Sequence, residues 1–194
     1  RMAPMFESVR AGDLNEDLVL MWSALRDGWL PPAELTREQY SRLKNSPPSA
    51  LRAFAGFGCS FGGKWFGGYA TNKGRRDYAG TARRGLLRKA AAIGSRVVVT
   101  QADYREWQPI QGEVVYCDPP YSGTTKYGGI GEFDTTIFWE TMTNWAAAGA
   151  HVYVSEYVAP EGVADAVWEV ETTSSLRLDD NASKITEKLF RVLC

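Results

Sequence analysis

The residues with the clearest chemical potential are Asp118, Pro119, Pro120 and Tyr121, which directly follow an apolar run at 114–117. A proline fixes its φ angle and has no backbone N–H, so consecutive prolines leave carbonyl oxygens that can accept hydrogen bonds from a ligand. Asp118 adds an ionised acceptor and Tyr121 a flat aromatic face. This set suits an amine on a flat ring, because Asp118 and the Pro119 carbonyl can each accept one N–H while Tyr121 stacks on the ring. The alternative is a Pro-Pro turn that only caps a strand.

Basic residues are concentrated in one segment. Residues 41–93 contain eleven Lys or Arg and a single acid, Asp77, which gives a formal charge of +10, whereas the rest of the chain has eleven basic and 22 acidic residues and carries −11. Cations attract phosphates and aromatic faces stack on bases, so this segment is predicted to bind nucleic acid. The alternative is a solvated basic face over a small core that uses the aromatic residues. The cations expected to contact nucleic acid include Lys64, Lys73, Arg75, Arg76, Arg83 and Arg84. The interleaved aromatic residues are Phe57, Phe61, Trp65, Phe66, Tyr69 and Tyr78.

The elements that must position these residues alternate along the chain. Strands are predicted at 9–13, 96–100, 113–117, 151–155, 167–172 and 188–193. Helices are predicted at 16–27, 36–44 with Thr36 as cap, 81–93 before Gly94, 135–148 and 162–166, and residues 56–74 are expected to be irregular. This order predicts a mostly parallel sheet covered by helices, with the last two strands as an antiparallel pair. Ligands bind at the carboxyl ends of such strands, where Asp13, Asp103 and Asp118 are expected.

Composition excludes several other classes. Apolar residues make up 44% and charged residues 23% of the 194 residues, as in soluble globular domains, and no run of 18 apolar residues or signal peptide is found. Cys59, Cys117 and Cys194 are odd in number and far apart, which predicts a reducing compartment without disulfides or a metal site. The only histidine, His151, lies in an apolar run, where a structural role is expected, and this disfavours a Ser-His-Asp triad or a zinc hydrolase.

The segment Asp118 to Tyr121 after an apolar strand resembles the catalytic motif of amino-methyltransferases, and the wider pattern resembles the Dam-type (D12 class) DNA adenine N6-methyltransferases, including phage members. This resemblance implies S-adenosyl-L-methionine as the cofactor. The acidic turn at 12–15, with Asp13 and Asn15, resembles the family's ribose-binding motif, and Asp103 with Tyr104 resembles the motif that contacts the cofactor's adenine. Each of these also has a plainer interpretation, since Asp13 could cap a helix and Asp103 could belong to a turn.

The resemblance extends over nearly the whole chain. Residues 57–69 resemble the glycine-aromatic stretch of phage members, whose glycines could instead allow close backbone packing, and residues 154–157 and 186–190 match their C-terminal strands. It implies an α/β, Rossmann-like methyltransferase sheet formed by residues 1–30 and 93–194, with a helical, basic target-recognition insert at 31–92. The family's Phe-x-Gly-x-Gly loop, which packs against the methionine part of the cofactor, has no counterpart in residues 1–12. A fragment that lacks the first strand and much of the cofactor pocket is therefore expected.

The implied activity is methyl transfer to N6 of adenine in double-stranded DNA, after the base flips out of the duplex, in the cytoplasm of a bacterial or phage-infected cell. No membrane, metal or obligate protein partner is implied. Restriction-modification, phage and housekeeping roles stay open. Two alternatives also stay open: modification of cytosine N4 or an RNA amine, and a catalytically incomplete DNA-binding remnant.

Overall fold

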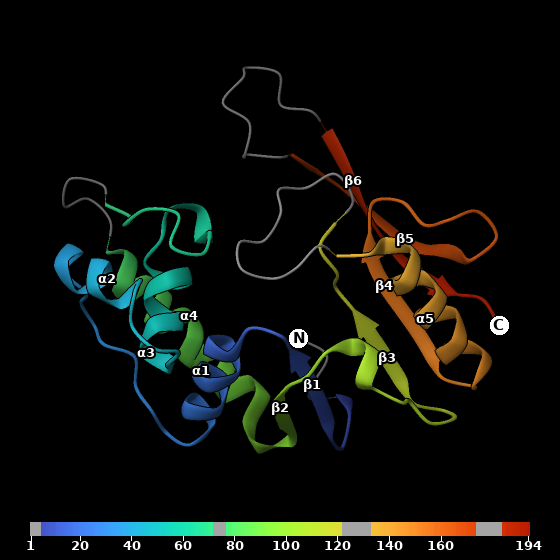
Figure 1. Cartoon of the computed structure of the whole chain (residues 1–194), viewed down its shortest axis with the longest axis horizontal. Helices are drawn as coiled ribbons and strands as arrows, with labels where there is room; N and C mark the ends of the chain where they lie inside the picture. The colour runs from blue at the N-terminus through green and yellow to red at the C-terminus, as the bar shows by residue number, and fades with distance from the viewer. Residues whose placement is uncertain (1–4, 72–76, 122–132, 174–183) are drawn as a thin grey trace. The chain divides into compact units, whose positions relative to one another are not determined.

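The computed structural model describes residues 5–71, 77–121, 133–173 and 184–194, which form a mixed α/β protein (Figure 1). The chain divides into two compact units, Arg1–Tyr104 and Arg105–Cys194, and each has its own sheet. The predicted division into a catalytic domain and an insert at 31–92 stays a prediction. None of the helices in the described part of the chain has the length and apolar character that crossing a membrane requires.

The first unit packs helices beside a two-stranded parallel sheet. Strands β1 (Val9–Asp13) and β2 (Val97–Gln101) pair with Val9 opposite Val97. The helices, grouped beside these strands in Figure 1, are α1 (Glu16–Arg26), α2 (Arg37–Leu43), α3 (Ala50–Ala53) and α4 (Tyr78–Ile93). Their buried side chains share one core with the segment 54–66, so α1 is packed directly against residues of the predicted insert. The core residues are Met21, Leu25, Leu35, Tyr40, Ala53, Phe54, Ala55, Cys59, Phe66 and Ala79.

Capping residues set the ends of these helices. Thr36 and Gln39 form a reciprocal capping box at the start of α2, which confirms the predicted cap. Gly94, with φ of 61°, ends α4 as predicted, because a glycine adopts this left-handed conformation without a steric penalty. Helix α4 begins three residues before its predicted start because the side chain of Asp77 accepts a hydrogen bond from the backbone N–H of Gly80 at 2.7 Å.

The glycine-rich segment is more ordered than predicted. Helix α3 continues into a π-helical turn, Phe54–Gly58, so the prediction that residues 56–74 are irregular is wrong at its start. A Cβ atom at Gly56 would lie 2.4 Å from the ring of Trp65, closer than any real contact. The absence of a side chain at Gly56 therefore makes room for the Trp65 ring, and the interpretation that the glycines let two backbones pack closely stays a prediction.

The second unit contains a four-stranded mixed sheet in the order β3-β4-β6-β5. Strand β3 (Val114–Cys117) is parallel to β4 (His151–Glu156), whereas β6 (Lys184–Val192) is antiparallel to both β4 and β5 (Ala164–Thr173). The expected antiparallel pairing of the last two strands is confirmed. The expected mostly parallel arrangement is wrong here, because β6 inserts between β4 and β5 and makes both of its pairings antiparallel.

Helix α5 (Thr135–Ala147) covers one face of this sheet and lies alongside β4 in Figure 1. The side chain of Asp134 caps it by accepting from the backbone N–H groups of Thr136 and Ile137 at 2.9 and 3.0 Å. Its apolar side packs toward Val152 and Val154 of β4, which are fully buried. The buried residues of α5 are Phe138, Trp139, Met142, Trp145 and Ala146.

One local prediction fails in this unit. The expected helix at 162–166 is wrong, because β5 begins at Ala164, which pairs with Val192. Strand pairing over a long stretch of β6 overrides the local preference of this short segment. The predicted strand start at His151 is confirmed, and the side chain of this residue, for which a structural role was expected, is exposed.

Candidate functional site

The carboxyl ends of β3 and β4 form the edge on which the proline motif lies. Asp118 directly follows β3, and Cys117, the last residue of β3, is paired with Val154 near the end of β4. Strand β6 runs in the opposite direction, with Lys188 opposite Glu156 at the last pairing to β4. Glu187 therefore lies at the edge where Asp118 begins its turn.

Tyr121 is fixed in orientation by two contacts. Its hydroxyl donates a hydrogen bond to Oε1 of Glu187 at 2.8 Å. Its ring meets the ring of Tyr157 edge to face, with centroids 4.7 Å apart and an interplanar angle of 86°. Such a geometry is favourable for aromatic pairs, and with the hydrogen bond it restricts the half-buried Tyr121 ring to one orientation.

The charges at this edge influence one another. Partial burial raises the pKa of Asp118, a hydrogen bond from Tyr121 opposes that rise, and the negative charge of Glu187 adds to it. Burial also raises the pKa of Tyr121, and the hydrogen bond to Glu187 and the charge of Asp118 raise it further. The phenol therefore keeps its proton and acts as a donor between two carboxylates.

The end of β4 adds buried polar groups. Ser155 and Glu156 are both buried, and the hydroxyls of Ser155 and Tyr116 share a hydrogen bond of 2.8 Å. The Glu156 carboxylate accepts a hydrogen bond from the backbone N–H of Tyr157. Polar side chains buried at the carboxyl ends of strands are typical of a ligand-binding edge.

The groups at this edge could accept hydrogen bonds from an N–H donor. Asp118 and Glu187 supply carboxylate oxygens, and Pro119, which is half-buried, supplies a backbone carbonyl. The nearby Cys117 is a poor nucleophile, because burial and then the charge of Asp118 raise the pKa of its thiol to about 12. Among the described residues, no group of three or more His, Cys, Asp or Glu side chains is arranged to hold a metal ion, and the three cysteines are free.

Glu187 and Tyr157 are parts of this edge to which the sequence analysis assigned no role. Both lie in segments that the sequence analysis named, 154–157 and 186–190, but only the antiparallel register of β4 and β6 brings Glu187 to Tyr121. The signal in the sequence was that Glu187 and the segment Ser155-Glu156-Tyr157 were both expected to lie in C-terminal strands.

The residues predicted to bind cofactor lie together in the first unit. Asp13 ends β1, and its backbone carbonyl accepts a hydrogen bond from the N–H of Ala102, just beyond β2, at 3.3 Å. Asp103 and Tyr104 follow directly and are half-buried. The side chain of Asp13 accepts from the N–H of Asn15 at 2.7 Å, and Asn15 itself caps α1. The interpretation of Asp13 as the helix cap is therefore wrong, whereas Asp103, before a short 3₁₀ turn, also fits its turn interpretation.

A pocket of about 180 Å³ borders Asp13. Its walls come from β1, β2, α1 and the end of α4, and most of them are apolar, including Trp22, Ile93 and Val97. Sites for ligands of drug size usually measure roughly 300–1,000 Å³. The Asp13 pocket therefore has room for part of a molecule such as S-adenosylmethionine, and its carboxylate suits a ribose hydroxyl.

The predicted nucleic-acid-binding cations differ in their surroundings. Lys64 is exposed, and Arg84 is exposed with an ion pair to Asp77 at 3.5 Å. Arg83 is half-buried, and its enclosed Nε has no hydrogen-bond partner among the described residues. Lys73, Arg75 and Arg76 lie outside the described residues. Three of the six predicted cations therefore have described positions in the first unit.

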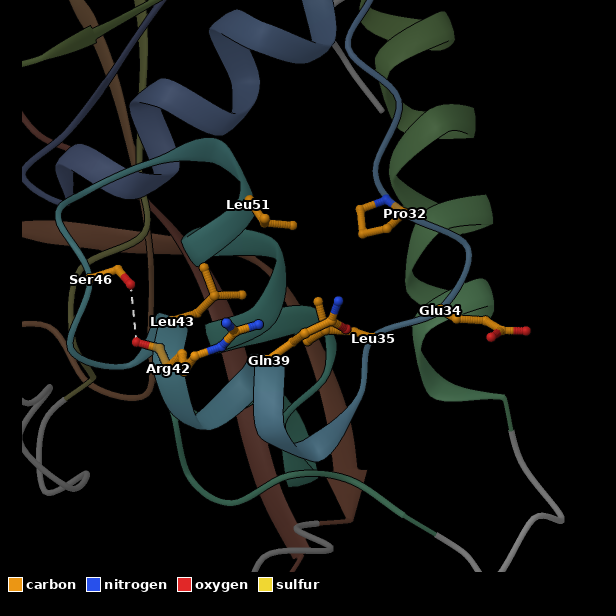
Figure 2. A pocket seen from close by; sticks show the side chains of 8 residues that line it. All are labelled: Pro32, Glu34, Leu35, Gln39, Arg42, Leu43, Ser46 and Leu51. Atoms are coloured by element: carbon orange, nitrogen blue, oxygen red, sulfur yellow. Dashed lines mark hydrogen bonds between the residues drawn. The ribbon is translucent and has the colours of Figure 1, made fainter.

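A larger pocket lies elsewhere in the first unit. It has a volume of about 360 Å³ and is formed by the segment before α2, by α2 itself and by the start of α3. Figure 2 shows Glu34 and Arg42 among its lining residues, with the hydroxyl of Ser46 donating to the backbone carbonyl of Arg42 at 3.0 Å. It includes none of the predicted catalytic or cofactor-binding residues, so its size alone does not identify it as the reaction site.

Comparison with known proteins leaves the family undetermined. No protein-family model matches the chain, and no curated protein matches it. Among solved structures, it is similar to the one described as "Crystal structure of SMU.472, a putative methyltransferase complexed with SAH", with a TM-score of 0.35 and 10% sequence identity. The match covers 95% of this chain and 48% of that chain, so this chain spans about half the length of that protein. A fit this loose carries no argument about function.

Proposed function

We propose that this chain is the catalytic part of an S-adenosylmethionine-dependent methyltransferase that modifies N6 of adenine in DNA. The observation that carries the proposal is the segment Asp118 to Tyr121 at the carboxyl end of β3, with the Tyr121 ring fixed by Glu187 and Tyr157. The mixed α/β fold and the two acidic residues at the ends of β1 and β2 are consistent with a nucleotide-like cofactor.

In the proposed reaction, the chain holds the amine of a flipped adenine. The Asp118 carboxylate and the Pro119 carbonyl each accept one N–H, and Tyr121 packs against the ring. Holding both hydrogens reduces conjugation of the nitrogen lone pair with the ring and directs it toward the methyl group. When bound, S-adenosylmethionine supplies that methyl group as an electrophile.

The amine nitrogen gains its new bond to carbon as the bond from that carbon to sulfur breaks, so positive charge moves from sulfur to nitrogen. The nitrogen then releases one proton. Asp118 is positioned to receive it, because its raised pKa makes it a stronger base than an ordinary aspartate. Asp13 and Asn15 would hold the ribose, and Asp103 and Tyr104 would contact the adenine of the cofactor.

The test is transfer of labelled methyl from S-adenosylmethionine to unmethylated genomic DNA, with Asp118→Ala as the control. Nucleoside analysis should identify N6-methyladenine with the unchanged chain and none with the variant. Formation of N4-methylcytosine instead, or transfer only to RNA, would replace adenine as the substrate. Equal transfer by Asp118→Ala would refute the assigned chemistry.

A non-catalytic DNA-binding role is the second candidate, and the small volume beside Asp13 favours it. Titration calorimetry with S-adenosylmethionine separates the two. Saturable binding that Asp13→Ala weakens supports the enzyme. A lack of cofactor binding together with salt-sensitive DNA binding supports the remnant.

A further inference from the structure

The segment from Cys59 to Ala70 forms a closed loop on the first unit. The backbone N–H of Ala70 donates to the Cys59 carbonyl at 2.8 Å, and the N–H of Phe61 donates to the Gly68 carbonyl at 2.9 Å. Ser60 and Tyr69 form an antiparallel bridge between these two bonds. The two ends of the loop are thus held together like the ends of a short hairpin.

Buried side chains attach this loop to the core. The hydroxyl of Tyr40 shares a hydrogen bond of 2.7 Å with the Ser60 hydroxyl and accepts another from the N–H of Gly68 at 3.2 Å. Phe66 is buried, with its ring 5.1 Å from that of Tyr40 and 4.8 Å from that of Trp65. These contacts leave the base of the loop little freedom to move.

Phe66 also has a strained backbone. Its φ angle is 43°, in a region that bulky residues rarely adopt. Such a conformation is unfavourable and persists only where the surrounding structure enforces it. Strained residues of this kind are often found in functional loops, so the exposed side chains of this loop are candidates for binding a partner.

The loop presents an exposed aromatic ring next to a cation. Phe61 is 70% exposed, and Lys64 is exposed three residues later, after Gly62 and Gly63 with φ angles of 64° and 68°. The other aromatic residues of the basic segment are half-buried or buried, and Trp65, Phe66 and Tyr69 pack in the core. Phe61 is the member of that set whose face is available to a partner.

We propose that Phe61 stacks on an unpaired or flipped-out base of DNA while Lys64 contacts a neighbouring phosphate. The choice of DNA rests on the proposed function. The joint role of Phe61 and Lys64 is inferred from the loop, which presents both side chains. An aromatic face can stack on a base, and a cation close to it can contact the phosphate of the same nucleotide or the next one. The +10 charge of residues 41–93 favours such a polyanion over an apolar protein partner.

The two side chains should change DNA binding in different ways. Fluorescence anisotropy is measured with the full chain and a duplex that contains one unpaired base, across a series of salt concentrations. Phe61→Ala should weaken binding by about 5- to 150-fold without changing the salt slope, since stacking on a base is worth roughly 1–3 kcal/mol and involves no counterion release. Lys64→Ala should reduce the salt slope by about 0.9.

Matched variants control for folding and for general apolar loss. Phe61→Trp should retain the affinity, and Trp168→Ala, which removes a 56% exposed ring on β5, should leave it unchanged. Wild-type affinity in Phe61→Ala, or equal losses in Phe61→Ala and Trp168→Ala, would overturn the proposal, as would a lack of DNA binding by the unmodified chain. If Phe61→Ala shows its loss while the chain transfers no methyl, the stacking role stands and only the proposed reaction fails.

Discussion

Replacing Arg52 with methionine should destabilise the first unit strongly, because it leaves a carboxylate buried without its counter-charge. Asp17 is 4% exposed, and its Oδ2 lies 2.6 Å from an Nη atom of Arg52. Its other oxygen accepts a hydrogen bond from the backbone N–H of Ser49 at 2.9 Å. Methionine keeps part of the side-chain volume but removes the charge and the hydrogen bonds.

The size of the effect follows from the burial of each partner. Removal of one partner of a buried ion pair costs about 3–5 kcal/mol, and the Arg52 side chain is 19% exposed, which places the loss near 3 kcal/mol. The reverse change, Asp17→Asn, should cost only about 1–2 kcal/mol. It keeps an acceptor for Ser49, and it leaves Arg52 partly exposed with the carbonyls of Leu43 and Lys44 as acceptors at 3.2 and 3.3 Å.

Urea unfolding of the wild type and both variants measures this difference in the free energy of unfolding. The combined variant, with both Asp17→Asn and Arg52→Met, should recover part of the loss of Arg52→Met, because no buried charge remains. A cost below about 1 kcal/mol for Arg52→Met, or equal costs for the two single changes, would refute the view that the buried carboxylate depends on Arg52.

Four further predictions concern the second unit. Glu187→Gln and Tyr121→Phe should each lower kcat by about tenfold, and the double variant should lower it no further, since both disturb the same hydrogen bond; additive losses would contradict this. Because the pKa of Asp118 is raised, activity should be lost on acidification at a higher pH than an ordinary aspartate would give, as a pH profile of kcat would show. The same shift means that the folded state holds its proton more tightly, so folding stability falls as pH rises through that pKa; Asp118→Asn should thus raise the melting temperature at neutral pH while abolishing transfer. A thiol reagent at pH 8 should modify exposed Cys194 rapidly and half-buried Cys117 more slowly, because its raised pKa leaves little thiolate, and equal rates would contradict this raised pKa.

Elements with local signals could be predicted from the sequence. The apolar runs of β2 and β3, the cap at Thr36 and the stop at Gly94 all depend on residues adjacent in the chain. The position of β6 between β4 and β5 depends on pairing across the whole second unit, which no local pattern contains. The start of β5 at Ala164 was missed for the same reason.

In the candidate site, too, residues with a local sequence signal could be predicted, and residues placed by long-range strand pairing could not. Asp118 and its neighbours were identified because an acid, two prolines and an aromatic residue follow one strand. Glu187 could not be assigned a role, since its contact with Tyr121 depends on the register of two antiparallel strands. Similarly, composition cannot tell exposed Phe61 from buried Phe66, because closure of the loop decides which ring enters the core.

The pairing of β1 with β2 has a consequence for the order of folding. Val9 pairs with Val97, so about ninety residues must be synthesised before the first strand meets its neighbour. At roughly 5–20 residues per second, β1 waits on the order of 5–20 s on the ribosome with its backbone hydrogen-bonding groups unpaired. Contacts so distant in sequence also make folding slow. The edges of β1 are therefore open to mispairing with other strands throughout this interval.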